Sequence, residues 1–182
     1  ETIAALREVG FPANLGLLPA GEHSIEAWHL MAAALEETDP GALDQLAVDY
    51  AAIYLTGAYG ASPCESVWTD DDHLACQDAM FGLREIYAAA GLAAEDWRRR
   101  PDDHLVLQLL YIAHALRRSD GAEELRRLAA MMDEHLLRWL PDFAARVAAR
   151  AETPFFALLG WLTFAWGEQL RDLLAESLGE PR

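Results

Sequence analysis

The sequence predicts an all-α fold, a single-domain helical bundle of about eight helices spanning residues 1–182. Apolar residues make up 53% of the chain, which is enough to bury a sizeable core in one compact domain. Alanine and leucine dominate these residues, and they recur at helical spacing. Glycine and proline cluster between the apolar runs, and no stretch alternates with period two for long enough to indicate a strand.

The N-terminal part of the chain predicts three helices separated by turns. These helices are expected over residues 2–9, in a segment capped by Ser24, and over residues 42–56, after an Asp-Pro-Gly turn. Tyr50 and Tyr54 lie one turn apart on the third helix, so they share a face and add aromatic surface there.

Residues 57–68 are the one long irregular connection. Two glycines and Pro63 interrupt any helix in this loop. A long irregular loop inside a compact helical domain is usually functional or mobile. After the loop, a new helix is predicted to start at Thr69 or Asp70 and to run to about Ala90.

The run from Pro101 to Leu116 predicts a capped core helix. Proline cannot continue a preceding helix, and Asp102 or Asp103 can accept hydrogen bonds from the first free N–H groups. Apolar residues recur from Leu105 at helical spacing and form one buried stripe. A polar edge beside that stripe consists of His104, Gln108 and Tyr111.

The C-terminal part predicts further helices. An amphipathic helix is expected over residues 122–140, interrupted by Pro141 and followed by two turns over 143–150. Thr153 and the proline after it are expected to cap a last helix that ends near Leu178. Its apolar run is too short to span a bilayer.

Charge and cysteine content narrow the classes of partner. The net charge is −16, with 30 acidic residues against 14 basic ones. Phosphate backbones and anionic lipid would repel such a chain, so we expect no nucleic-acid partner and no membrane insertion, and basic partners are favoured. Cys64 and Cys76 do not make a disulfide framework, and no secretory signal peptide is present, which favours a cytoplasmic location.

Two alternatives to a binding protein remain open. A metal-dependent hydrolase could use His73 and Cys76, which share a face if they lie on a helix, together with Asp103 and His104, with Cys64 as a further ligand. However, there is no Cys-x-x-Cys pair, phosphate loop or other enzyme signature, so we expect neither a cofactor nor catalysis. A helical scaffold domain, with all these residues merely packed, is the second alternative.

Two stretches combine into a candidate peptide-binding site. Pro63, Glu65, Ser66 and Trp68 lie in the loop, and Pro101, Asp103 and His104 open the later helix. Trp68 offers a flat apolar wall, and Glu65 and Asp103 are expected to place negative charge at its rim. Such a site suits a peptide with an apolar segment beside basic residues, especially arginine, because a carboxylate can bind a guanidinium bidentately.

These residues resemble the TorD/DmsD/NarJ-type cytoplasmic chaperones, which assist maturation of molybdenum-containing oxidoreductases. The loop pattern is met by Pro63, Ser66, Val67 and Trp68, and the Pro-x-Asp-His-Leu pattern by the stretch from Pro101 to Leu105. A third segment runs from Glu134-His135-Leu136 through Trp139-Leu140-Pro141 to Thr153-Pro154-Phe155-Phe156. The chain departs from the family at Gln108, usually acidic, at Cys64, often aromatic, and at the N-terminal helix, of which only a remnant is present.

The resemblance implies an all-helical fold prone to domain-swapped homodimers. It also implies binding of the twin-arginine signal peptide on the apo-form of a molybdenum-containing oxidoreductase before export. His104, held by Asp103, would act as a pH-sensitive hinge. The expected signal-peptide-binding residues are Tyr50, Tyr54, Pro63, Glu65, Ser66, Trp68, Pro101, Asp103, His104 and Gln108.

Overall fold

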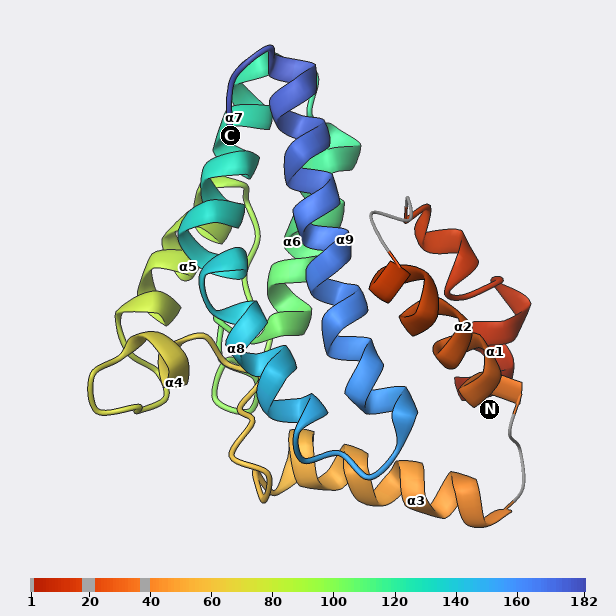
Figure 1. Ribbon diagram of the computed structural model, residues 1–182. Helices are drawn as coiled ribbons and strands as arrows, with labels where there is room; N and C mark the ends of the chain where they lie inside the picture. The colour runs from red at the N-terminus through yellow and green to blue at the C-terminus, as the bar shows by residue number, and fades with distance from the viewer. Residues whose placement is uncertain (1, 18–21, 37–39) are drawn as a thin grey trace. The chain divides into compact units, whose positions relative to one another are not determined.

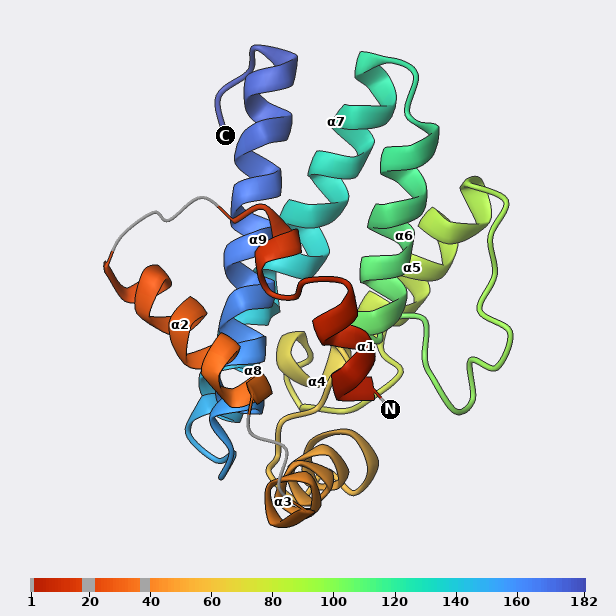
Figure 2. The same ribbon diagram turned by 90° about the vertical axis from the view of Figure 1, so that its right-hand side faces the viewer.

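The computed structural model describes residues 2–17, 22–36 and 40–182, and every regular element in these ranges is helical (Figures 1 and 2). The predicted all-α fold is therefore confirmed. The elements are α1 (Thr2–Glu8), the 3₁₀ turn η1 (Ala13–Leu15), α2 (Glu22–Glu36), α3 (Pro40–Tyr50), the π-helical turn η2 (Ala51–Leu55), α4 (Ser66–Thr69), α5 (Asp78–Ala89), α6 (Leu105–Arg118), α7 (Ala122–Met131), the π-helical turn η3 (Met132–Leu136), α8 (Leu137–Ala148) and α9 (Pro154–Leu178). None of the described helices is long and apolar enough to cross a membrane.

Contacts along the chain define two compact units. The first unit comprises residues 1–61 and 141–169, and the second unit comprises residues 62–140 and 170–182. The first unit thus contains α1 to α3, and the second contains α4 to α7 with both motifs of the candidate site. A single domain for the whole chain stays a prediction.

The second unit is built on α6 and α7, which run side by side and are joined by a short turn (Figure 2). Leu105 and Ile112 of the predicted stripe are buried, and they pack in a core that also includes Leu128 of α7. Leu116 lies near the end of α6 and is 38% exposed. Of the predicted polar edge, Gln108 is fully buried, whereas His104 and Tyr111 are partly exposed.

The predicted helix from Thr69 or Asp70 to Ala90 is wrong in its first part, because residues 70–77 are irregular. Asp70 Oδ2 accepts hydrogen bonds from the backbone N–H groups of Asp72 and Leu74. Such local bonds compete with helical ones. His73 and Cys76 also adopt positive φ values of 55° and 61°, which a right-handed helix excludes. They therefore do not share a helical face.

Three helix boundaries also differ from prediction. Pro141 does not interrupt its helix but lies inside α8, one turn after the π-helical turn η3, where the α-helical pattern resumes. Helix α2 begins at Glu22, before the predicted Ser24 cap. Helix α3 begins at Pro40, as suits a residue without an N–H group, and Asp39 of the predicted turn lies outside the described residues.

The predicted cap of the last helix is confirmed, and a buried carboxylate reinforces it. Helix α9 begins at Pro154, directly after Thr153. Asp49 of α3 accepts hydrogen bonds from the backbone N–H groups of Glu152 and Thr153 and from the Thr153 hydroxyl. Tyr59 donates a further one at 2.7 Å. Asp49 therefore ties three segments of the first unit together.

Candidate functional site

The two candidate motifs meet in the second unit. Cys64 and His104 form an isolated antiparallel β-bridge. The backbone N–H of Glu65 donates to Asp103 O at 3.2 Å, and that of Leu105 donates to Pro63 O at 2.8 Å. The stretches from Pro63 and from Pro101, distant in the sequence, are thus held together by backbone hydrogen bonds.

Asp103 caps a helix other than its own. Its Oδ2 atom accepts the backbone N–H of Ser66 at 2.8 Å and so satisfies a free donor at the start of α4. The prediction that Asp102 or Asp103 caps α6 is wrong. The N-cap of α6 is His104, whose Nδ1 atom accepts the backbone N–H of Val106 at 3.1 Å.

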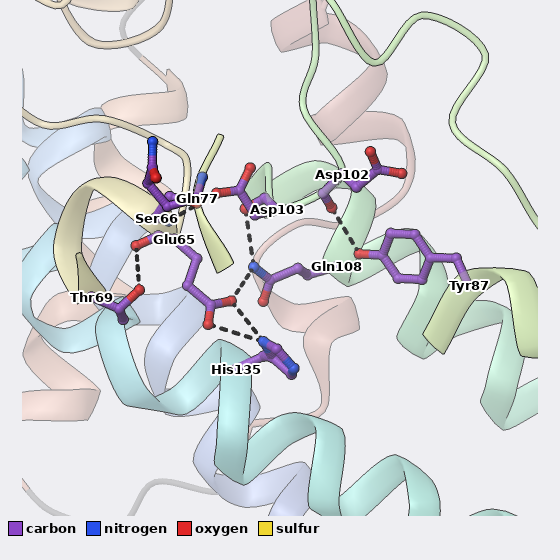
Figure 3. Close-up of polar contacts among 9 residues, drawn as sticks. All are labelled: Glu65, Ser66, Thr69, Gln77, Tyr87, Asp102, Asp103, Gln108 and His135. Atoms are coloured by element: carbon purple, nitrogen blue, oxygen red, sulfur yellow. Dashed lines mark hydrogen bonds and ion pairs between the residues drawn. The ribbon is translucent and has the colours of Figure 1, made fainter. Parts of the chain in front are cut away.

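Glu65 is the centre of a buried cluster that we define as Glu65, Asp103, Gln108 and His135 (Figure 3). Glu65 Oε2 accepts a hydrogen bond from Gln108 Nε2 at 3.0 Å. His135 Nδ1 lies 3.0 Å from Glu65 Oε1 and 3.2 Å from Oε2. Gln108 Nε2 also donates to Asp103 O at 3.1 Å. The cluster therefore joins the loop, the start of α6 and the π-helical turn η3.

Burial changes the expected role of the two acidic residues. Glu65 is 1% exposed and Asp103 is 0% exposed, so neither presents its charge to solvent. The prediction that both lie at the rim of the site is therefore wrong: the Asp103 carboxylate holds the backbone of Ser66, and the Glu65 carboxylate holds the side chains of Gln108 and His135. Gln108 fits between them because its amide can donate two hydrogen bonds, which a carboxylate at this position could not do.

Helix α5 fixes the same turn from its other side. Arg84 donates from Nε and Nη2 to Asp102 Oδ2 at 3.1 and 2.8 Å. Tyr87 OH donates to Asp102 O at 3.1 Å. The Arg84 guanidinium also lies 4.9 Å from the Trp97 ring centroid and 5.5 Å from that of Phe81. Sequence reasoning missed Arg84 and Tyr87, although their spacing of three on a predicted helix could have paired them.

Trp68 lies on the short helix α4 and is partly exposed. Its ring Nε1 donates to Ser62 O at 2.8 Å, which fixes the indole against the loop. Ser66, by contrast, is buried, and its hydroxyl accepts the backbone N–H of Gln77 at 3.1 Å. Asp71 and Asp72, just after α4, are exposed. These aspartates, rather than Glu65 and Asp103, supply solvent-facing negative charge next to the Trp68 helix.

Tyr50 and Tyr54 belong to the first unit. Their rings stack with centroids 5.2 Å apart, and both rings lie near Phe156, at 6.5 and 6.2 Å. Burial raises the pKa of Tyr54 to about 12, and the nearby Tyr50 adds to this shift. A shared groove of these tyrosines with Trp68 stays a prediction.

The metal-ligand set on which the hydrolase alternative depends is not assembled. Within residues 2–17, 22–36 and 40–182, no three His, Cys, Asp or Glu side chains are grouped so that they could hold a metal ion. His73 Nδ1 instead lies 2.9 Å from Val67 O. Cys64 is buried, and burial raises its pKa to about 12, so the thiolate form that binds metals is disfavoured.

Because His104 caps α6 through a ring nitrogen, we expect the stability of the protein to depend on pH. Burial lowers the pKa of His104, and Arg100 lowers it further, although Asp103 opposes the shift. The imidazole therefore binds a proton more readily in the unfolded chain than in the folded one. The stability that the cap contributes should be fully present above about pH 6.5, and it should be lost as the pH falls through the lower pKa of the folded state. His104→Asn keeps a capping acceptor that does not titrate.

In urea unfolding between pH 7.5 and 5, we expect the wild type to lose about 1 kcal/mol more stability than His104→Asn. Equal losses in the two proteins would contradict this role of His104.

Comparison with known proteins places this geometry in context. The nitrate reductase delta subunit family matches residues 21–145. The chain is 32% identical to chaperone protein TorD of Shewanella pealeana over 145 residues, which cover 75% of this chain and 64% of that protein. It is 28% identical to TorD of Shewanella sp. strain ANA-3 over 177 residues, covering 92% of this chain and 80% of the relative. For TorD of Vibrio cholerae strain ATCC 39541, identity is 29% over 175 residues, with 91% and 79% covered.

The chain spans somewhat less than two thirds of the length of the Shewanella pealeana protein, 64%. No solved structure matches the chain significantly.

Proposed function

The chain belongs to the nitrate reductase delta subunit family, and on this premise we propose that it is a chaperone, not an enzyme, for the maturation of a molybdenum-containing oxidoreductase. In the finer form of the proposal, it binds the twin-arginine signal peptide of the apo-enzyme in the cytoplasm, before export. The similarity to proteins named TorD chaperones supports the general role. The residues around Trp68 support the finer one.

One observation carries the peptide-binding proposal. The buried cluster holds two distant motifs together in one corner. Beside that corner Trp68 is partly exposed, and Asp71 and Asp72 are exposed. An indole face suits the apolar part of a leader peptide, and exposed carboxylates attract its arginines. Glu65 and Asp103 act here as positioning residues, because their burial keeps them from the surface.

The cluster also retains unused acceptors. Among the described residues, Asp103 Oδ1 and Gln108 Oε1 are buried and accept no hydrogen bond. Buried polar atoms without a partner are uncommon in native proteins and call for a physical explanation. Both atoms are shielded from solvent, so in this proposal Asp103 and Gln108 position the loop and do not contact the leader.

The test is a titration of a fluorescent leader peptide that carries an arginine pair. Trp68→Ala should weaken binding by roughly 30-fold, because removing an aromatic residue at the centre of an interface costs about 2 kcal/mol. Neutralising both carboxylates, in Asp71→Asn/Asp72→Asn, should weaken binding by roughly 3- to 10-fold and make it less sensitive to salt.

Two matched controls test whether the loss of binding is specific to Trp68 and to the two aspartates. Trp161→Ala removes a tryptophan of the first unit that is 39% exposed, and Glu85→Gln removes an exposed carboxylate of α5. Both should bind the peptide like the wild type. If the controls weaken binding as much as the Trp68 and aspartate variants, or if the wild type does not bind the leader, the proposal is overturned.

A further inference from the structure

One cavity in the second unit, of about 330 Å³, shares no lining residue with the buried cluster. It is open to solvent and is lined by the end of α5, by link residues 92–94 and by α6. Its volume is at the lower end of the range typical of small-ligand sites. The cavity therefore has a size that suits a small molecule.

The body of this cavity is apolar and aromatic. Tyr87 and Tyr111 line it and stack with ring centroids 5.2 Å apart. Leu107 and Leu110 of α6 contribute aliphatic wall, and Leu110 remains 58% exposed to water. A ligand with an apolar body would cover that exposed leucine and gain the free energy of its burial.

One end of the cavity is cationic. His114 and Arg117, three residues apart on α6, line it, and no carboxylate does. In the part of the chain that the structure describes, neither side chain forms a hydrogen bond or an ion pair. Both groups are therefore available to an anionic ligand.

A neighbouring cavity provides the contrast. It has a volume of about 500 Å³ and is lined by Arg118 and Arg127, but also by Asp120, Glu124 and Glu134. Its mixed charges favour no single ligand charge. Tyr111 and His114 line both cavities, whereas Arg117 lines only the smaller one, so Arg117 is the charge that favours an anion there.

We propose that the smaller cavity binds a small amphiphilic carboxylate. The apolar body of the ligand lies against Tyr111, Leu107 and Leu110, and the Arg117 guanidinium takes the carboxylate, with His114 beside it. A body of about eight to twelve carbons fills the volume. This inference is independent of leader-peptide binding, since it uses neither Trp68 nor the buried cluster.

The test compares three probes with the same chain, decanoate, decanol and decyltrimethylammonium, by isothermal titration calorimetry below their micelle-forming concentrations. Decanoate should bind the wild type at least 10-fold more tightly than the cation, with decanol between them. Arg117→Gln should weaken decanoate binding at least fivefold, and Leu110→Glu should do the same by placing a carboxylate at the cavity.

Arg118→Gln is the matched control, because it removes the same charge from the adjacent residue of α6, which lines the other cavity. It should change decanoate affinity by less than twofold. Circular dichroism checks that all three variants are folded. Equal losses in Arg117→Gln and Arg118→Gln, equal affinities for decanoate and the ammonium probe, or no decanoate binding would each overturn the proposal.

Discussion

Replacing Glu65 with alanine should lower the free energy of unfolding by about 3–5 kcal/mol, because it leaves Gln108 and His135 without their shared buried partner. Urea unfolding at pH 7 measures the loss. Glu85→Ala, which removes an exposed carboxylate of α5, is the matched control and should cost less than about 0.5 kcal/mol.

A triple variant tests whether the stability loss of Glu65→Ala comes from unpaired polar partners or from lost packing. In Glu65→Leu/Gln108→Leu/His135→Leu the polar partners are all removed, so part of the stability should return relative to Glu65→Ala. A loss below about 1 kcal/mol for Glu65→Ala would contradict the central place of this carboxylate.

Replacing Asp49 with alanine should cost about 3 kcal/mol or more, since it removes the acceptor for Tyr59 and for the start of α9. Burial alone would raise the pKa of Asp49, but hydrogen bonds from Thr153, Tyr59 and the backbone of Glu152 outweigh it, so the pKa lies below the ordinary value of 3.8. The stability that this group contributes is therefore present above its unfolded-state pKa and lost as the pH falls through the folded-state pKa.

Thermal unfolding of wild type and Asp49→Asn between pH 6 and 2.5 checks the sign. The wild type should be the more stable protein at pH 6, and the difference should shrink as the pH falls below the ordinary pKa of aspartate. A difference that grows towards low pH would rule out an ionised Asp49 as the source of this stability.

Local signals were sufficient for part of the fold. Thr153 followed by Pro154 marks the start of α9, because both the cap and the proline act on neighbouring backbone. The spacing of Leu105 and Ile112 likewise identifies the buried face of α6. The predicted family is also confirmed, since three ordered motifs carry more information than any single residue.

The wrong predictions arise where hydrogen bonds of a side chain override the helical propensity of the local sequence. Asp70 was predicted to start a helix, but its carboxylate binds the N–H groups of the next residues and holds an irregular segment open. The burial of Glu65 and Asp103 could not be predicted either. Burial depends on partners such as His135, which is distant in the sequence, and no periodic pattern records such a pairing.

The π-helical turn η3 determines the direction in which the His135 side chain points from the helix axis. A π-turn accommodates one residue more than the α-turn it replaces, and each residue of an α-helix advances the side-chain direction by roughly 100°. Met132 and Leu136, the first and last residues of this turn, are both fully buried. Losing one residue here would restore an uninterrupted α-helix, yet it would swing the imidazole out of line with Glu65. A deletion of one residue in this segment is therefore expected to break the contact between His135 and Glu65.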